Sequence, residues 1–137
     1  VEAIGRASVV LYASSSAKDT DWHVRLCDVY PDGAARFLAH GMLRARFRET
    51  FEEPHFLEPN EVYRFEFGLD AVGVRFQPGH RIRVEITSSW FPEYDRNTNS
   101  GAANNFLDDQ FVVATNRIYH DAERASHIVL PLMPVAD

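Results

Sequence analysis

Arg81-Ile82-Arg83-Val84-Glu85-Ile86 is the stretch of the chain that most clearly decides its fold class. Charged and aliphatic side chains alternate strictly along it, and all three aliphatic residues are β-branched. This pattern is typical of a strand with one face in a protein core and the other in water. Tyr63–Leu69 alternates in the same way, with aromatic or aliphatic residues on one parity and Arg64 and Glu66 on the other. Such alternation dominates the chain and predicts an all-β protein.

Further strands and the turns between them indicate the architecture. Strands are predicted at Ala7–Ala13, Trp22–Leu26, Asn116–His120 and Ser126–Leu132, with a polar turn at Asp121–Ala125. Proline with glycine or asparagine marks turns at Pro31-Asp32-Gly33, Pro59-Asn60 and Pro78-Gly79. Several strands at near-regular spacing predict an antiparallel β-sandwich of the jelly-roll type. We expect less than about a tenth of the chain in helix, against the usual third.

Two stretches need separate interpretation. Leu43–Arg48 alternates as a strand, yet Leu43, Phe47 and Phe51 also repeat at helical spacing. We interpret it as extended. Ser88–Asn105 is a long polar loop that carries three aromatic residues, and loops of this length in compact domains usually have a function or hold a contact.

Length, charge and cysteine content limit the function classes. The 137 residues are enough for one domain, 1–137, and 45% apolar composition is that of a globular protein. A net charge of −6 argues against nucleic acid and anionic membranes as partners, and no apolar run approaches the roughly 18 residues of a membrane span. The single cysteine, Cys27, is compatible with the cytoplasm without establishing a compartment. Because the chain begins at Val1 without a leader, we interpret it as a fragment of a longer polypeptide.

The chain carries no recognisable catalytic set. The Gly-x-Ser-x-Gly elbow of serine hydrolases is absent, and the serines at Ser14–Ser16 and Ser88-Ser89 are interpreted as turn and cap residues. Cys27 lies in the middle of a predicted strand, as a structural thiol would. The six histidines lack the spacing of zinc ligands. We therefore expect no catalytic residue, no metal and no cofactor in this segment.

Two ligand-binding alternatives stay open at this stage. Asp95–Asn99, with Asp108 and Asp109 beyond it, offers oxygen ligands to calcium, although the order of an EF-hand loop is missing. Trp90, Phe91 and Tyr94 could stack on sugar rings, which would make the domain a carbohydrate- or ligand-binding module. A small enzyme with an unrecognised site is the third possibility.

Several strings in register resemble the C-terminal domain of the cocaine esterase and X-Pro dipeptidyl-peptidase family of serine hydrolases. They cover nearly the whole chain in the family's order: Asp19–Trp22, Asp28–Gly33, Gly41–Arg48, Pro78–Arg83, Ser88–Pro92, Asp95–Gly101, His120 and Ser126–Pro131. Trp22 and Trp90 are mild departures from the family's pattern.

The resemblance implies both a fold and a role. The fold is a jelly roll similar to galactose-binding domains, a likeness that does not establish sugar binding. The family's Ser-Asp-His triad lies in a preceding α/β-hydrolase domain with a helical cap, and none of it maps onto this sequence. The implied role is non-catalytic: packing against those two domains of the same chain, with homo-oligomer contacts as a further possibility. The parent enzyme would cleave esters or amides through an acyl-enzyme.

Two sets of residues are singled out within this role. Asp28 shares the parity of inward-facing residues and must find donors, for which Arg44, Arg46, Arg96 or backbone amides are candidates; we favour an arginine.

Trp90, Phe91 and Tyr94, with Arg96 as polar anchor, are predicted to form an interdomain contact, because aromatic residues and arginine are the usual energetic centres of interfaces. The alternative is that all three rings fold back onto this domain's own core.

Overall fold

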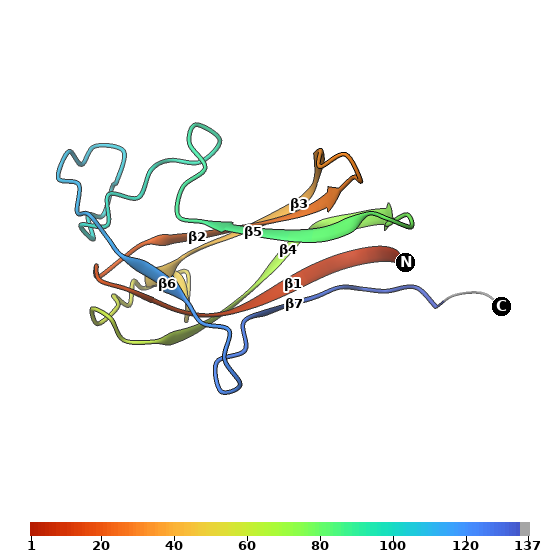
Figure 1. Cartoon of the computed structure of the whole chain (residues 1–137). Helices are drawn as coiled ribbons and strands as arrows, with labels where there is room; N and C mark the ends of the chain where they lie inside the picture. Colours follow the sequence, from red (N-terminus) through yellow and green to blue (C-terminus); the bar gives the residue numbers. More distant parts are fainter. Residues whose placement is uncertain (135–137) are drawn as a thin grey trace.

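The computed structural model describes residues 1–134 and shows two antiparallel sheets packed face to face (Figure 1). The first sheet is built on the long strand β1 (Glu2–Ser15). β4 (Tyr63–Arg75) pairs along one side of β1, and the short strands β6 (Asn116–Ile118) and β7 (His127–Val129) share the other side. The end of the described chain runs beside the start of β1, where the backbone N–H of Ile4 donates to the carbonyl of Pro131.

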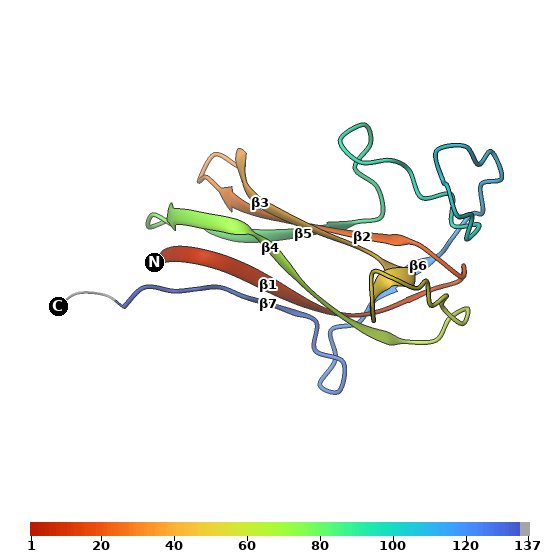
Figure 2. The same cartoon turned by 180° about the vertical axis from the view of Figure 1, so that it is seen from behind.

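The second sheet has β2 (Asp21–Val29) between β3 (Ala35–Arg44) and β5 (Arg81–Thr87). Figure 2 shows the same two layers from behind. The only helical segment among residues 1–134 is the 3₁₀ turn Ala45–Phe47. The predicted antiparallel β-sandwich with almost no helix is confirmed.

The core lies between the sheets and consists of the alternate residues that the strand pattern predicts. Trp22 of β2 and Phe65 of β4 are both fully buried, and their ring centroids are 5.7 Å apart. Burying a large side chain of this kind stabilises the fold by roughly 1.5–3 kcal/mol. The largest fully buried residues after these two are Leu11, Leu26 and Leu69.

The two long edges of the sandwich differ. At one edge β3 and β4 approach so closely that a Cβ on Gly41 would clash with the carbonyl oxygen of Gly68, so only glycine fits there. At the other edge β5 faces β7, and within residues 1–134 neither strand pairs with the other. The sandwich is closed on one side and open on the other.

The predicted turns are confirmed by backbone geometry. Gly33, Asn60 and Gly79 all have positive φ, which proteins give preferentially to glycine and asparagine. At the first turn the N–H of Gly33 donates to the carbonyl of Tyr30 at 2.9 Å.

The extended interpretation of Leu43–Arg48 is wrong beyond Arg44. β3 ends at Arg44, and Ala45–Phe47 forms the 3₁₀ turn. The cause is the preceding acidic segment, because Asp19 accepts a hydrogen bond from the backbone N–H of Arg46 at 3.0 Å. The N–H of Ala45 donates to the carbonyl of Thr20, which adds a second bond and turns the chain.

The last two predicted strands exist but are shorter than expected. β6 covers Asn116–Ile118 and β7 covers His127–Val129. Both pair with the same edge of β1, and the turn between them interrupts the ladder. At the break, the Tyr12 N–H donates to the hydroxyl oxygen of Ser126 at 2.9 Å instead of to a backbone carbonyl.

Candidate functional site: the loop between β5 and β6

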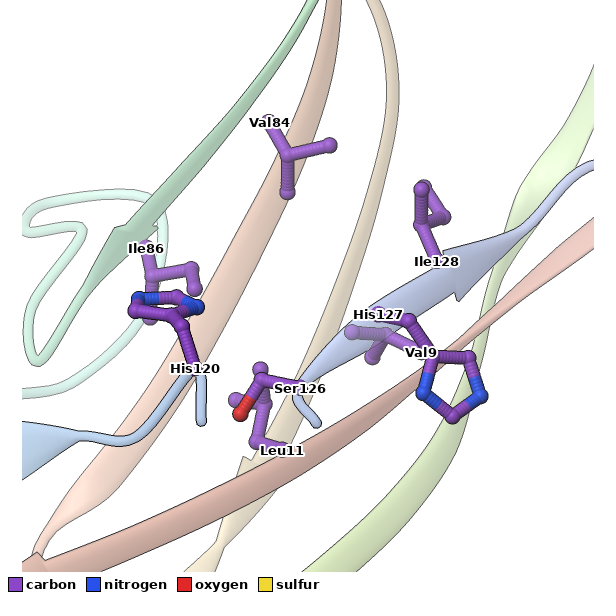
Figure 3. A pocket seen from close by; sticks show the side chains of 8 residues that line it. All are labelled: Val9, Leu11, Val84, Ile86, His120, Ser126, His127 and Ile128. Carbon is purple, nitrogen blue, oxygen red and sulfur yellow. The ribbon is translucent and has the colours of Figure 1, made fainter. Parts of the chain in front are cut away.

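The open edge contains an apolar groove of about 290 Å³ (Figure 3). One wall of the groove is formed by Val84 and Ile86 of β5. The other wall is formed by residues of the opposite sheet, Val9 and Leu11 of β1 and Ile128 of β7. His120, Ser126 and His127 add polar atoms.

The serine and histidines of this groove are not arranged for nucleophilic catalysis. The hydroxyl oxygen of Ser126 accepts from the Tyr12 backbone, and Nδ1 of His127 bonds the carbonyl of Ala125 at 2.7 Å. No hydrogen bond joins Ser126 to either His120 or His127 in the described part of the chain. A serine nucleophile needs such a base to accept its proton, so the groove lacks the arrangement of an acyl hydrolase.

The remaining candidate nucleophiles are structural. Ser14 is fully buried, and its hydroxyl bonds the Tyr119 hydroxyl at 3.1 Å. Ser88 accepts from the amide of Asn116 at 2.6 Å. Cys27 is buried, and desolvation raises the pKa of its thiol, which disfavours the reactive thiolate. Within residues 1–134, no three His, Cys, Asp or Glu residues are placed together to hold a metal ion.

The most distinctive part of the molecule is the long loop that follows β5 and ends at β6, residues 88–115, which extends beyond one end of the sandwich (Figure 1). It is longer than the predicted Ser88–Asn105. Its lower part rests on four buried or half-buried charged residues at or next to the ends of β2 and β3. Together with Asn97 of the loop we call this set the base: Asp19, Asp21, Arg44, Arg46 and Asn97.

The base contains two arginine–carboxylate pairs side by side. Nε of Arg46 donates to Asp19 at 2.8 Å, and both residues are at most 3% exposed. Arg44 donates to Asp21 through Nε at 2.8 Å and through an Nη at 3.0 Å, which is a bidentate pair. Hydrogen bonding to Asp21 raises the pKa of the Arg44 guanidinium, which therefore stays charged.

The loop is tied to the four charged residues of the base by three residues of its own. The amide of Asn97 lies 2.8 Å from Asp19 and 2.8 Å from Asp21, so it bridges the two pairs. Asp95 accepts from Arg44 at 3.2 Å, and the carbonyl of Ala102 accepts from Arg46 at 2.7 Å. Buried charges are tolerated only when matched in this way, so the loop and the base complete one another.

Within the loop, Asp108 gathers hydroxyl donors. Its Oδ2 lies 2.6 Å from the hydroxyl of buried Thr98 and also accepts from the hydroxyl of Ser100. These bonds lower the pKa of the Asp108 carboxyl. Two of the oxygen ligands considered for the calcium alternative are thus engaged by other groups: Asp108 by hydroxyls and Asp95 by Arg44.

The upper part of the loop presents apolar side chains to solvent. Phe106 is 82% exposed and Val113 is 96% exposed. We call the exposed apolar residues of the loop the crest: Phe91, Phe106, Leu107, Phe111, Val112 and Val113. Several large apolar side chains on one loop form the kind of surface that in other proteins contacts a partner.

Arg96 organises part of the crest. Its guanidinium lies 5.2 Å from the ring centroid of Phe91 and 5.1 Å from that of Phe111. Cation–π contacts of this kind each contribute about 0.5–1 kcal/mol at exposed sites. The structure therefore brings Phe91 and Arg96 together and adds Phe111.

The other two predicted contact residues lie differently. Trp90 packs against His40 of β3, with ring centroids 4.3 Å apart, and Tyr94 lies 5.0 Å from the same histidine. Both are half-buried, whereas Phe91 is 61% exposed. The three rings are therefore not all folded into this domain's own core, and they divide into an inward pair and an outward phenylalanine.

The arginine prediction for Asp28 is wrong. Asp28 is buried, as its strand parity predicts, but both of its oxygens contact Nδ1 of His80, at 2.9 and 3.0 Å. The reason is the strand register: β3 runs antiparallel to β2, so Arg44 lies opposite Asp21, at the far end of β2 from Asp28.

Sequence analysis missed most of the crest because the predicted loop ended at Asn105. Phe106-Leu107 and Phe111-Val112-Val113 are apolar runs without alternation, between polar residues, in a stretch with no predicted strand. That combination is the available signal for an exposed apolar loop. No helix in residues 1–134 is long and apolar enough to cross a membrane.

Comparison with known proteins finds that the chain is similar to one part of several longer proteins. The model of the X-Pro dipeptidyl-peptidase C-terminal non-catalytic domain matches residues 1–129. Cocaine esterase of Rhodococcus sp. (strain MB1 Bresler) is 45% identical over 135 residues, which cover 97% of this chain and 23% of that protein. A putative serine esterase of Mycobacterium tuberculosis (strain CDC 1551 / Oshkosh) is 29% identical, over 97% of this chain and 22% of its own length.

Solved structures agree with these sequence matches. An α-amino acid ester hydrolase superposes with a TM-score of 0.91 at 38% identity, over 95% of this chain and 23% of that one. An aminopeptidase from a marine sediment archaeon, Thaumarchaeota archaeon, gives a TM-score of 0.90 at 34% identity, over 94% and 23%. The chain thus spans less than a quarter of the length of these relatives.

Proposed function

The chain belongs to the family of X-Pro dipeptidyl-peptidase C-terminal non-catalytic domains, and from this premise we propose that residues 1–137 are one domain of a longer serine acyl hydrolase of the esterase or X-Pro dipeptidyl-peptidase type. In this proposal the catalytic triad belongs to an α/β-hydrolase domain of the same chain, and the sandwich packs against that domain and its cap. The relatives support it, because their names include esterases, an ester hydrolase and an aminopeptidase, all about four times longer.

The exposed apolar residues of the crest are the main support for the proposed packing role. Phe106, Leu107 and Val113 are each more than three-quarters exposed. Single exposed apolar residues are normal on a protein surface, but here several large ones lie on the same loop. Burial of these side chains would contribute a favourable free energy of about 25 cal/mol for each Å² of apolar surface removed from water. Contact between the crest and a neighbouring domain would therefore stabilise the complete protein by burial that the isolated 137-residue chain lacks.

Hydrogen bonds to the base order the loop that carries the crest. Asn97 fixes the lower loop to the carboxylates of Asp19 and Asp21, and Asp95 and Ala102 fix it to Arg44 and Arg46. The N–H of Val112 donates to the carbonyl of Thr98 at 2.8 Å. A loop that is ordered beforehand loses less conformational entropy on docking. Arg96, held between Phe91 and Phe111, supplies the charged group that interfaces commonly pair with such rings.

The hydrolase part of the proposal is tested by active-site labelling. A fluorophosphonate probe reacts with serines activated by a neighbouring base. Applied to the complete gene product and followed by peptide mapping, it should label one serine outside residues 1–137. Stoichiometric labelling of any serine inside this segment would overturn the proposal.

The packing part is tested with a matched pair of variants in the complete gene product. Leu107→Ser removes a crest residue that is 77% exposed, and Leu132→Ser removes a 57% exposed leucine beside Ala3 of β1, outside the loop. We expect Leu107→Ser to lower the melting temperature by several degrees more than Leu132→Ser, while the 137-residue chain tolerates both. Equal effects of the two variants would argue against the crest as the contact.

Self-association is the competing occupant of the crest. Light scattering of the 137-residue chain separates the two cases: a crest-dependent dimer that disappears with Leu107→Ser would assign this surface to homo-oligomer contacts instead.

A further inference from the structure

A second recess lies on the inward side of the same loop, where Trp90 and Tyr94 face β3. It encloses about 360 Å³ and is lined by Phe37, His40, Asp70, Trp90, Glu93 and Tyr94. Four of these six residues are aromatic or heteroaromatic, and the other two are acidic. The proposed packing role of the crest does not account for this composition.

The aromatic rings form walls and not a stack. The Trp90 and Phe37 rings meet at 72° with centroids 5.5 Å apart, and the Trp90 and His40 rings meet at 77°. The hydroxyl of Tyr94 lies 3.4 Å from Nδ1 of His40, and the Tyr94 and His40 rings meet at 49°. Rings set at steep angles around a recess can present more than one face or edge to the same small group.

The carboxylates give the recess its charge. Asp70 is fixed there, because its Oδ2 accepts from the backbone N–H of His40 at 3.2 Å. Within residues 1–134, neither Asp70 nor Glu93 forms an ion pair. Burial lowers the pKa of His40, so this histidine is neutral at pH 7 and does not offset the two negative charges.

Trp90 already contacts one cation. The guanidinium of Arg25 lies 5.2 Å from its ring centroid, which shows that a face of this indole accepts positive charge. Arg25 is itself neutralised by Glu85, at 2.9 Å, and it does not line the recess. The negative charge of Asp70 and Glu93 is therefore left for another group.

We propose that this recess, walled by Phe37, Trp90 and Tyr94 and charged by Asp70 and Glu93, binds an organic ammonium group. Aromatic faces attract weakly hydrated organic cations, and nearby carboxylates add attraction without requiring the cation to lose a tight hydration shell. A divalent metal ion fits less well, because it needs several oxygen ligands in a fixed geometry and the recess offers two carboxylates from different segments. The proposal stands independently of the packing role of the crest.

Tetramethylammonium chloride is the probe, with Trp90 fluorescence as the readout and ionic strength held constant with sodium chloride. The other tryptophan, Trp22, is 1% exposed in the core and provides a constant background. We expect a saturable change in fluorescence of the 137-residue chain. tert-Butanol, which has the same shape without the charge, should bind about tenfold more weakly or not at all.

Two near-isosteric variants test the carboxylates. Glu93→Gln and Asp70→Asn each keep the side-chain size, and Asp70→Asn keeps an oxygen for the His40 N–H. Each should weaken tetramethylammonium binding about threefold, as expected for one exposed charge pair, while Glu123→Gln, an exposed glutamate elsewhere, should not. A linear response, an equal response to tert-butanol, or unchanged binding in the Glu93→Gln/Asp70→Asn double variant would overturn the proposal.

The same titration in the complete gene product identifies the source of the cation. A response there indicates that the recess is open to a free organic ammonium ligand. If the 137-residue chain responds and the complete product does not, another part of that product covers the recess, and the proposal of a free ligand site there is overturned.

Discussion

The base and the crest belong to the same loop region, yet they satisfy opposite requirements. In the base, charged groups are buried, and the structure supplies partners for them: Asp19 with Arg46, Asp21 with Arg44, and Asn97 between the two pairs. In the crest, apolar groups such as Phe106 and Val113 are left in water. Removing a partner from the base should therefore damage this chain itself, whereas a crest residue should matter only to whatever covers it.

The largest effect is expected in the base. Asp19→Ala leaves the guanidinium of Arg46 buried without its carboxylate, and breaking a buried pair in this way costs about 3–5 kcal/mol. The free energy of unfolding from urea denaturation measures it. Asp109→Ala, which removes an exposed carboxylate in the same loop, is the control and should change stability by less than about 0.5 kcal/mol. Equal effects of the two variants would contradict the stabilising role of the buried pair of Asp19 and Arg46.

A second buried carboxylate tests whether pairing, and not position in the loop, explains the effect. Asp28 lies at the opposite end of β2 and is paired with His80. Asp28→Ala should cost about 1–3 kcal/mol, as for a buried hydrogen-bonded group that loses its partner. A double-mutant cycle with His80→Ala should show a coupling of at least about 0.5 kcal/mol. Additive effects would mean that Asp28 and His80 are not energetically coupled.

A smaller, pH-dependent effect on the free energy of unfolding is expected from two buried histidines, His23 and His40. Nδ1 of His23 and Nε2 of His40 share a hydrogen bond of 3.1 Å, and burial lowers the pKa of both rings from the ordinary 6.5. The unfolded chain therefore binds more protons than the folded one below pH 6.5, and stability should fall as the pH drops through that value. The charged groups that act on the two rings are Asp21, Arg25, Arg44, Asp70 and Asp95.

Urea midpoints at pH 7.5, 6.5 and 5.5 measure this dependence. His40→Gln should reduce the loss between pH 7.5 and 5.5, because one of the two depressed histidines is gone. His127→Gln is the control, since His127 is exposed. A midpoint that stays constant across this range in the unaltered chain would show that the pair does not titrate with folding.

The smallest effect is expected at the crest. Val113→Ser changes a side chain that is 96% exposed, so the unfolding free energy of the 137-residue chain should shift by no more than about 0.5 kcal/mol. The same change in the complete gene product should cost more, if the crest is covered there. A large loss in the short chain would mean that the crest supports its own domain.

The difference between base and crest also separates what sequence reasoning could and could not find. Alternation identified the strands and correctly placed Asp28 inward, because parity decides which face a side chain occupies. Parity does not determine which residue of a neighbouring strand lies opposite a given position. The prediction of an arginine partner for Asp28 was therefore wrong. The pairs of Arg44 and Arg46 depend on the β2–β3 register and on the turn that follows it.

The long loop shows the same limit. Its existence and its aromatic residues were predicted, but the separation of Trp90 and Tyr94 from Phe91 depends on His40, which comes from a strand fifty residues earlier. Phe111 joins Arg96 only because the loop turns back on itself through Thr98 and Val112. No local pattern encodes a contact of that kind.

The position of β1 has a consequence for the order of folding. The first strand of the chain is the centre of its sheet, and its partners include β7, whose Ile128 lies opposite Val9. The sheet therefore cannot be completed until more than a hundred further residues have been synthesised. Non-local pairings of this kind make folding slow, on the order of milliseconds to seconds, because a large loop must close before the contact forms. During translation, β1 must wait with one edge unpaired until the last strands leave the ribosome.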